Sequence, residues 1–318
     1  MRNSPASGRR SILTNLEKPL LICVVGATGI GKTALAIEIA KAFATEIISA
    51  DSRQFFKEMT IGTAVPSSEE LAAAPHHFIQ HKSIFDSYSV GDFEREALLK
   101  LDVLFEKHQI VVLVGGSGLY VDAVVSGLDS FPEIPSEIRA QLNSEFSAKG
   151  IAFLRQELSR VDPEYFKKVD AQNSHRLIRA LEIYRGTGKP YSSFLKKKKT
   201  SRNFDTLYVG LTADRKIIYD RINRRVDNMV ASGLIEEAKN LLANKKSNAL
   251  QTVGYRELFQ FFEGEFSQEK AIEEIKKNTR RFAKRQHTWF GKNDTINWFN
   301  FETPIKDIIA CIKAKKAL

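Results

Sequence analysis

The sequence predicts an α/β fold, in which a parallel sheet flanked by helices carries an inserted, mainly helical domain. Three observations lead to this prediction. Short apolar segments alternate with helical patterns over residues 19–130. A glycine-rich motif lies between the first apolar segment and the first helical one. Beyond residue 131 the pattern becomes helical and basic, and an apolar strand pattern returns near residue 204.

The predicted strands are short and apolar, which is typical of strands that are buried in a parallel sheet. They are Leu20–Val25, Glu46–Ala50, Ile110–Val114, Leu207–Leu211 and Ile296–Phe299. The helices predicted in the same parts of the chain have apolar residues at helical spacing. They are Thr33–Phe43, Phe93–Lys107, Asp214–Ala231, Leu234–Leu242, Tyr255–Phe262, Gln268–Phe290 and Pro304–Ala317.

The segment Phe131–Pro135, with two prolines, marks the start of the inserted region. Helices are predicted there over Ser136–Lys149, Ile151–Arg160 and Ser174–Tyr184. We therefore expect a core of residues 19–130 and 204–318, an insertion domain of residues 131–203, and a loose tail over residues 1–18. Two domains that follow one another in sequence are the alternative.

Composition excludes several classes of protein. The chain is 43% hydrophobic and 27% charged, as globular proteins are. No apolar run approaches the roughly 18 residues that span a bilayer, and Leu20–Ala27 is among the longest. Met1–Glu17 is basic but has no apolar centre, which argues against a secretory signal. Cys23 and Cys311 cannot form a disulfide framework, so we expect a reduced, cytoplasmic protein.

The charge of the chain is unevenly distributed. The net charge is +10, but residues 1–130 carry 12 basic and 15 acidic side chains, a balance of −3. Residues 131–318 carry 36 basic and 23 acidic side chains, a balance of +13. This asymmetry indicates a polyanionic partner for the second part, and nucleic acid is the commonest. A solvated basic surface without a partner is the alternative.

Residues 26–33 (GATGIGKT) match the P-loop pattern and lie between a predicted strand and a predicted helix, as the motif requires. The glycines allow backbone N–H groups to converge on phosphate oxygens, and the helix N-terminus adds partial positive charge. Lys32 is placed to neutralise the outer phosphates and Thr33 to hold a magnesium ion. The predicted core is therefore P-loop NTPase-like, and its ligand is a polyphosphate of undefined kind.

The third predicted strand argues against an ordinary ATPase. It ends in Gly115, Gly116 and Ser117, and the next carboxylate is Asp122. An ATPase would have an acidic residue here to organise magnesium and water. Since ligands bind at the carboxyl ends of parallel strands, Ser117 can offer a hydroxyl near the phosphates. A plain turn serine is the alternative.

Two further groups are candidates for chemistry. Asp51 ends the second strand and can act as a general base toward an acceptor, or simply cap a turn. Arg221, Arg224 and Arg225 follow the fourth strand on one helix, and Arg225 lies one turn beyond Arg221. An arginine there can reach a leaving phosphate, although a solvated face accounts for at least one of the three.

Histidines and a basic helix complete the candidate residues. His76, His77 and His81 lack a fourth ligand or a cysteine partner, so loop or packing roles are preferred to a metal site. A helical face beside the aromatic pair Trp289 and Phe290 is basic and suits contact with a phosphate backbone, or is solvated. It contains Lys277, Arg281, Lys284 and Arg285, with Lys276 and Arg280 nearby.

A series of motifs in this order resembles the bacterial tRNA dimethylallyltransferases, also called tRNA isopentenyltransferases. The resemblance runs from about Leu21 to Phe290, nearly the whole chain. The motifs are GATGIGKT at 26–33, SADSRQ at 49–54, IGTAVP at 61–66, APHH at 74–77, YSVGDF at 88–93, LVGGSGLY at 113–120, RLIRALEIY at 176–184, GTGKP at 186–190, QTVGYRE at 251–257 and AKRQHTWF at 283–290.

The resemblance implies transfer of a dimethylallyl group from dimethylallyl pyrophosphate to N6 of the adenosine at tRNA position 37. By the family pattern Asp51 is the general base, Ser117 is the catalytically important hydroxyl residue and Arg225 assists the pyrophosphate. The pyrophosphate of the donor would lie on Gly26, Ala27, Thr28, Gly29, Ile30, Gly31, Lys32 and Thr33, with Thr33 holding Mg²⁺. The missing acidic residue fits this chemistry, because no water needs activation.

The family pattern also implies the residues that contact tRNA. They are Asp51, Ser52, Arg53, Gln54, Arg139, His175, Arg176, Leu177, Ile178, Arg179, Gln251, Thr252, Val253, Gly254, Tyr255 and Arg256. The insertion domain would hold the anticodon stem, the preferred loop would carry adenosines at tRNA positions 36–38, and the family suggests a monomer. Neither the set of substrate tRNAs nor the oligomeric state follows from the residues themselves.

The chain departs from the family pattern at three positions. Ser117 replaces the usual threonine and keeps the hydroxyl, Val65 replaces a common lysine, and His175 replaces a frequent glutamine. No C-terminal Cys/His zinc-finger pattern is present, unlike in eukaryotic relatives.

Three other functions are alternatives. A P-loop kinase for a small molecule fits the P-loop and Asp51 but not the basic insertion. A prenyltransferase for free adenine nucleotides needs fewer cationic contacts than the second half of the chain offers. A non-catalytic, GTPase-like RNA-binding module lacks both the acidic strand end and a base-specificity motif.

Overall fold

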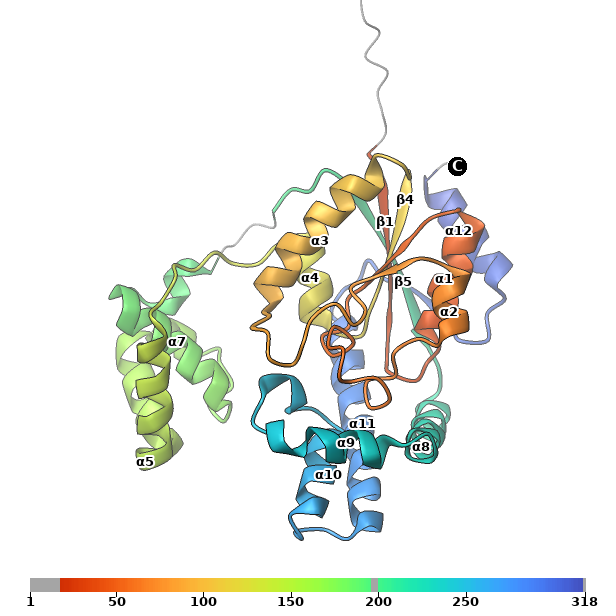
Figure 1. Ribbon diagram of the computed structural model, residues 1–318. Helices are drawn as coiled ribbons and strands as arrows, with labels where there is room; N and C mark the ends of the chain where they lie inside the picture. Colours follow the sequence, from red (N-terminus) through yellow and green to blue (C-terminus); the bar gives the residue numbers. More distant parts are fainter. Residues whose placement is uncertain (1–17, 196–199, 317–318) are drawn as a thin grey trace, which may run out of the picture. The chain divides into compact units, whose positions relative to one another are not determined.

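The computed structural model describes residues 18–195 and 200–316 (Figure 1). These residues form two compact units, one over Ser126–Ser201 and one made of the described residues up to Val125 and from Arg202 onward. The predicted tail, apart from Lys18, lies outside the described residues, as does Ala317 of the predicted last helix.

The larger unit is built on a parallel sheet of six strands in the order β3-β2-β4-β1-β5-β6. The strands are β1 (Leu20–Gly26), β2 (Ile47–Ser49), β3 (His76–His77), β4 (Ile110–Val114), β5 (Asp205–Thr212) and β6 (Asn297–Asn300). Each paired strand runs parallel to its neighbour. The predicted fold class, a parallel sheet flanked by helices, is confirmed.

Helices cover both faces of this sheet, because successive side chains of a strand point to opposite faces. Leu21 and Cys23 of β1 belong to one apolar cluster, whereas Ile22 and Val24 belong to another. Helices α3 (Val90–Phe105) and α4 (Gly118–Ser126) contribute to the first cluster. Helices α1 (Lys32–Ala42) and α12 (Ile305–Lys316) contribute to the second, on the other side of the sheet in Figure 1.

The remaining helices of this unit are α2 (Ser68–Ala73), α8 (Arg215–Ala231), α9 (Leu234–Leu241), α10 (Tyr255–Phe262) and α11 (Gln268–Phe290). Two 3₁₀ turns, Leu242–Asn244 and Asn248–Leu250, connect α9 to α10. None of the helices in the described ranges combines the length and apolarity that crossing a membrane requires. The sequence patterns did not predict β3, α2 or α4.

A loop between β2 and α2 is held by the carboxylate of Glu237 on α9. The backbone N–H groups of Thr60, Ile61 and Gly62 donate to it at 3.0, 2.7 and 2.9 Å. The Tyr255 hydroxyl donates to the same carboxylate at 2.6 Å. A Cβ at Gly62 would lie 2.6 Å from the Tyr255 ring, so this position has no room for a side chain.

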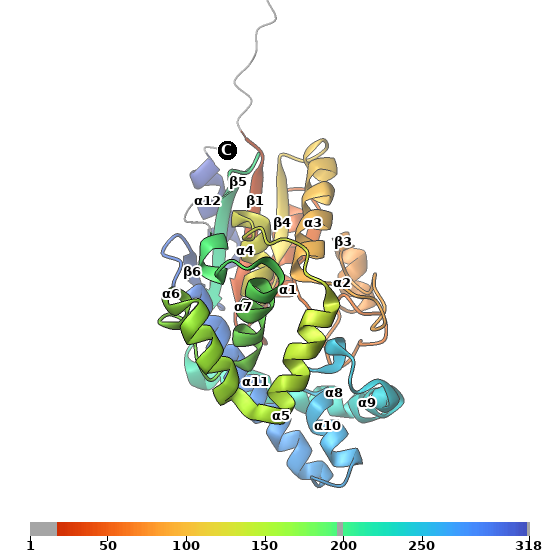
Figure 2. The same ribbon diagram turned by 90° about the vertical axis from the view of Figure 1, so that its left-hand side faces the viewer.

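The smaller unit consists of α5 (Ser136–Val161), α6 (Pro163–Phe166), α7 (Ser174–Thr187) and a 3₁₀ turn over Tyr191–Phe194 (Figure 2). Leu142, Leu154 and Leu158 of α5 pack with Leu177 and Leu181 of α7 in an apolar cluster. The two ends of the unit meet, because the N–H of Thr200 donates to the carbonyl of Ser126 at 3.0 Å.

Helix α5 is two helical segments that meet at Gly150, which has φ 72° and ψ −175°. The predicted break between Lys149 and Ile151 is therefore confirmed. An L residue rarely adopts this backbone conformation, whereas glycine adopts it without strain.

Gly150→Ala is expected to lower the free energy of unfolding of the smaller unit by about 1–3 kcal/mol, because alanine is strained at this φ and ψ. Urea unfolding followed by circular dichroism measures this change. The control is Ser144→Ala, an exposed position on the same helix, where a change within about 0.5 kcal/mol is expected. Equal stability of the Gly150→Ala and wild-type proteins would contradict the strain argument.

Candidate active site

Three loops meet at one edge of the sheet because β2, β4 and β1 are parallel neighbours. They are residues 26–33 after β1, residues 50–54 after β2 and residues 115–118 after β4. Packing between two of them is close: a Cβ at Gly115 would lie 2.5 Å from the carbonyl oxygen of Ala50. This edge is where ligands of open α/β sheets bind.

The P-loop has the backbone that its glycines allow. Gly26 has φ +143°, and a Cβ there would lie 2.7 Å from the carbonyl oxygen of Leu211. Gly31 is left-handed, with φ 110°, and α1 begins at the next residue, Lys32. The ammonium of Lys32 donates to the carbonyl of Ala27 at 2.9 Å, which holds it over the loop.

The charges beside the P-loop are tightly packed. Burial and, to a smaller extent, nearby Arg225 together lower the pKa of Lys32 to about 8, although Asp51 opposes the shift. Burial also lowers the pKa of Arg225, again opposed by Asp51. The positive charges of Lys32 and Arg225 repel each other, so an anion bound between them would stabilise both charged forms.

Arg221 has a different position from Arg225. Its Nε donates to the carbonyl of Gly29 in the P-loop at 2.8 Å, and its guanidinium lies over the Phe301 ring, 5.2 Å from the centroid. Arg221 therefore braces the loop, and it shares with Arg225 the lining of a pocket beside the P-loop. The third arginine of the predicted cluster, Arg224, is exposed at the rim.

Gln286 of α11 connects the P-loop to the loop after β4. Its Oε1 accepts from the N–H of Thr28 at 2.8 Å, and its Nε2 donates to the carbonyl of Gly116 at 3.0 Å. The side chain is buried. The sequence patterns did not assign a role to Gln286. The only feature of the sequence that pointed to it is the family motif at residues 283–290.

The candidate base and hydroxyl lie together on the other two loops. Ser117 Oγ accepts from the N–H of Ser52 at 3.2 Å and donates to Ser52 Oγ at 3.1 Å. Asp51 Oδ1 accepts from the N–H of Arg53 at 3.0 Å. Asp51 therefore makes a turn, as the alternative interpretation predicted, and also lines a pocket.

Two pockets adjoin at this edge. The first, about 730 Å³, is lined by the P-loop residues Gly29, Gly31, Lys32 and Thr33, by Arg221, Arg224 and Arg225, and by the segment Thr60–Pro66 in part. The second, about 500 Å³, is lined by Asp51, Ser52, Arg53, Ser117, Tyr120, the segment Gln251–Gly254, Arg256, Arg285, Gln286 and Trp289. Arg225 and Met229 line both pockets. Both pockets are rich in cations. Lys32 and three arginines line the first together with the Glu70 carboxylate, and four arginines line the second together with the Asp51 carboxylate and the Ser117 hydroxyl.

Several predicted tRNA-contact residues fix the loops around the two pockets. Gln54 donates to the carbonyl of Ala64 at 2.8 Å. Arg53 donates to the carbonyls of Asn248 and Ala249 at 2.9 and 3.0 Å. The side chain of Tyr255 is fully buried, so it positions its segment and presents no side-chain surface to a ligand.

The predicted contact residues of the smaller unit cluster on its two long helices. Arg139 lies on α5, and the segment His175–Arg179 forms the first turns of α7. The side chains of Leu177 and Ile178 are buried in the apolar cluster of this unit. His175 and Arg176 are exposed.

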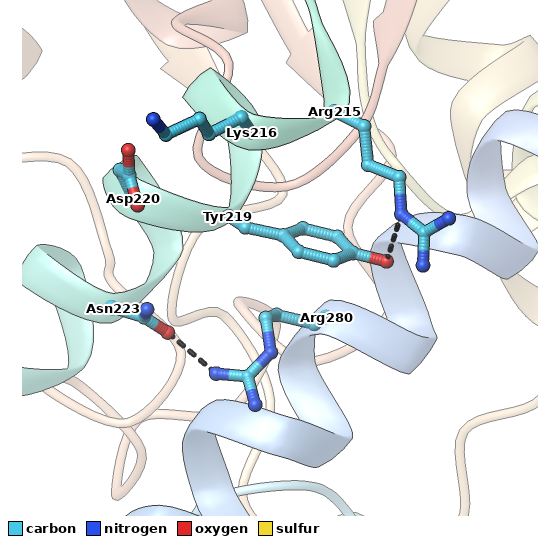
Figure 3. Close-up of a pocket in the computed structure, with 6 residues that line it drawn as sticks. All are labelled: Arg215, Lys216, Tyr219, Asp220, Asn223 and Arg280. Atoms are coloured by element: carbon cyan, nitrogen blue, oxygen red, sulfur yellow. Dashed lines mark hydrogen bonds between the residues drawn. The ribbon is translucent and has the colours of Figure 1, made fainter.

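A further pocket, of about 640 Å³, lies between α8 and α11 and contains none of the predicted catalytic residues (Figure 3). The Tyr219 ring lies between the guanidinium groups of Arg215 and Arg280, 5.1 and 5.9 Å from its centroid. Arg215 donates to the Tyr219 hydroxyl at 3.0 Å, and Arg280 donates to Asn223 at 2.7 Å. Arg215 and Arg280 are thus engaged with Tyr219 and Asn223 within the pocket.

The histidines singled out by the sequence make local contacts. His77 pairs with Glu46 at 2.6 Å, and His76 Nδ1 lies 2.8 Å from the carbonyl oxygen of Ala74. The His81 ring packs edge-on against Phe55 and Tyr88. These contacts are those of loop and packing residues.

The basic face of α11 divides between pockets and ion pairs. Lys277 pairs with Glu274 at 2.8 Å, and Lys276 pairs with Asp227 at 2.8 Å. Arg285 lines the second pocket together with the half-exposed Trp289. Part of the predicted phosphate-contact face is therefore engaged within the protein.

Comparison with known proteins identifies relatives along nearly the whole chain. The tRNA dimethylallyltransferase of Christiangramia forsetii is 60% identical over 295 residues, which are 93% of this chain and 98% of the relative. That of Flavobacterium johnsoniae is 57% identical over 295 residues, which are 91% and 96% of the two chains. The matches confirm the resemblance inferred from the motifs.

A solved structure and a family model agree with these relatives. The crystal structure of the tRNA isopentenylpyrophosphate transferase from Bacillus halodurans superposes with a TM-score of 0.69 and 36% identity, over 94% of this chain and 96% of its own. The family model described as IPP transferase matches residues 54–293. The chain therefore belongs to the IPP transferase family.

Proposed function

We propose that this protein transfers a dimethylallyl group from dimethylallyl pyrophosphate to N6 of adenosine 37 in tRNA. The observation that carries the proposal is the pair of adjoining pockets that share Arg225 and Met229. A transfer between two substrates needs their reacting atoms to meet, and a cation-rich pocket next to a carboxylate provides such a place. Relatives that cover most of the chain are named tRNA dimethylallyltransferases.

The first pocket suits the pyrophosphate of the donor. P-loop residues, Lys32 and Arg225 line this pocket, and the proposal places the leaving group among them. When the bond between the allylic carbon and the pyrophosphate oxygen breaks, negative charge grows on that oxygen. Cations fixed there in advance stabilise the transition state more than the ground state.

Magnesium is part of the proposal. Thr33, in the first turn of α1, lines the same pocket as Lys32. A single hydroxyl beside substrate phosphates fits Mg²⁺, which keeps several water ligands. Thr33 would hold the ion, and bound magnesium would supply further positive charge to the pyrophosphate.

The second pocket suits the acceptor base. Bases of RNA loops are readily unstacked, and an enzyme that modifies a base takes it out of the stack. The amine nitrogen attacks the allylic C1 carbon, the carbon–oxygen bond breaks, and pyrophosphate leaves. Asp51 accepts the proton that the amine loses. The Ser117 hydroxyl donates to Ser52, the residue that follows Asp51 in the chain.

The anticodon stem-loop of tRNA is the proposed partner, and the contact residues are those that the family pattern implies. The net charge of +13 over residues 131–318 supports a polyanionic substrate. The proposal also takes the protein to be a cytoplasmic monomer. Free nucleotides and phosphorylation of a metabolite are less well supported, since the names of the relatives favour neither.

The direct test is prenyl transfer by the purified protein with magnesium and labelled dimethylallyl pyrophosphate. One tube contains an unmodified tRNA with adenosines at positions 36–38, and parallel tubes contain AMP or ATP. Label that enters only the tRNA, mapped to position 37 by mass spectrometry, is the expected result. Label in free nucleotide, or consumption of ATP without transfer, would replace the proposal by one of its alternatives.

Asp51→Asn is expected to reduce kcat for prenyl transfer by about 10²–10⁴-fold, because asparagine cannot accept the amine proton. Asparagine keeps the oxygen that accepts from Arg53, so the turn is retained. The control is Asp86→Asn, an exposed turn aspartate that accepts from Ser83 and lies outside both pockets. Near-wild-type turnover of Asp51→Asn in single-turnover assays would eliminate Asp51 as the base.

Binding of inorganic pyrophosphate is expected to depend on pH through Lys32. The pKa of Lys32 is lowered to about 8, so the ammonium loses its proton as pH rises through that value. Isothermal titration calorimetry should show that the affinity for pyrophosphate falls by up to about tenfold per pH unit above this pKa. Lys32→Arg stays charged over this pH range, and the ionisation of pyrophosphate affects both proteins equally. The plot of affinity against pH should therefore be flatter for Lys32→Arg than for wild type. Parallel profiles of the two proteins would exclude Lys32 as the titrating group.

A further inference from the structure

Two arginines of the smaller unit converge on one buried carboxylate. Arg139 of α5 donates through Nε and Nη2 to Glu182 at 3.0 and 2.7 Å. Arg179 of α7 donates through Nη1 to Glu182 Oε2 at 2.9 Å. The Glu182 side chain is 7% exposed, whereas those of Arg139 and Arg179 are 48% and 39% exposed.

The charges in this cluster do not balance. Two guanidinium groups share one carboxylate, so a positive charge remains at the surface of the unit. Burial acts to raise the pKa of Glu182, but the hydrogen bonds from Arg139 and Arg179 outweigh it and keep the pKa below its usual value. A guanidinium has more N–H donors than this contact uses, and the exposed parts of both groups can reach another anion.

Aromatic packing fixes one of the two arginines further. The Arg179 guanidinium lies 5.3 Å from the centroid of the Phe131 ring. That ring stacks on Tyr191 with a centroid distance of 4.9 Å and an interplanar angle of 13°. The direction of Arg179 is therefore set by a ring on one side and a carboxylate on the other.

The same unit contains an ion cluster of the opposite kind. Arg185 donates to Glu157 at 2.9 and 2.6 Å and to Glu145 at 2.8 Å. Here one guanidinium, 20% exposed, lies between two carboxylates. This cluster joins α5 to α7 but has no excess positive charge. It therefore serves as a comparison for the Glu182 cluster in which only a structural role is expected.

We propose that Glu182 is a positioning residue that holds Arg139 and Arg179 as a paired binding site for phosphates of an RNA backbone. The inference rests on the proposed function, since it takes RNA as the substrate. Guanidinium groups bind phosphate through parallel N–H donors, and this geometry requires that each group be held in a fixed orientation.

The sign of the effect separates positioning from simple charge. Glu182→Gln removes a negative charge, so an unspecific electrostatic role would tighten RNA binding. Positioning predicts the reverse, because the two arginines repel each other and lose their common anchor. We expect the KM for tRNA to rise about tenfold, as for the loss of one charge-assisted contact, with kcat within about twofold of wild type.

Direct binding provides a second readout. Titration of an anticodon stem-loop RNA at several salt concentrations gives the slope of log K against log salt. Each lost phosphate contact lowers the magnitude of that slope by about 0.7–0.9, so Glu182→Gln should show a shallower slope than wild type. This measurement does not depend on prenyl transfer, so failure of the proposed reaction and failure of the positioning role are distinguishable.

Glu157→Gln is the matched control, since it also removes a carboxylate that accepts two bonds from an arginine of α7. It should lower the melting temperature but leave KM and the salt slope unchanged. If Glu182→Gln does not fold, Arg139→Lys keeps the charge and loses the two-bond contact, and it should raise KM in the same way. Unchanged or tighter RNA binding by Glu182→Gln, or equal effects of the two glutamate variants on KM, would overturn the proposal.

Discussion

The site depends above all on the parallel pairing of β2, β4 and β1 in that order. This pairing brings three loops, each at the end of a different strand, to one edge of the sheet. The cost of placing cations there is visible in Lys32, whose pKa is lowered to about 8 by burial and by Arg225. A rigid sheet can sustain this unfavourable arrangement, which an exposed loop would relax.

Under the proposed function, the two pockets at this edge hold the donor and the acceptor separately. Cations gather around the P-loop, whereas Asp51 and Ser117 lie on the neighbouring loops. Arg225 borders both pockets, so in the proposed reaction it would act on the leaving group while the acceptor occupies the other pocket. Gln286 fixes the distance between the P-loop and the loop after β4 through hydrogen bonds to Thr28 and Gly116.

Local patterns in the sequence predicted much of this arrangement, and their failures have physical reasons. The strands β1 and β4 were predictable because they are uniformly buried and apolar, whereas β3 is only His76–His77 and has no pattern to detect. Helix α4 was missed because it begins at Gly118, inside a glycine-rich turn. Glu237 and Gln286 were not singled out, since the backbone groups that they hold lie more than a hundred residues away along the chain.

The hydrogen bond between Thr200 and Ser126 closes the smaller unit at its base. The chain leaves and re-enters the α/β core at nearly the same point in space, so the sheet does not require the intervening residues for its connectivity. Such an insertion can be lengthened, shortened or exchanged during evolution without changing strand order. Under the proposed function, the surface of the smaller unit that contacts tRNA can therefore diverge among relatives faster than the edge of the sheet proposed to carry out the chemistry.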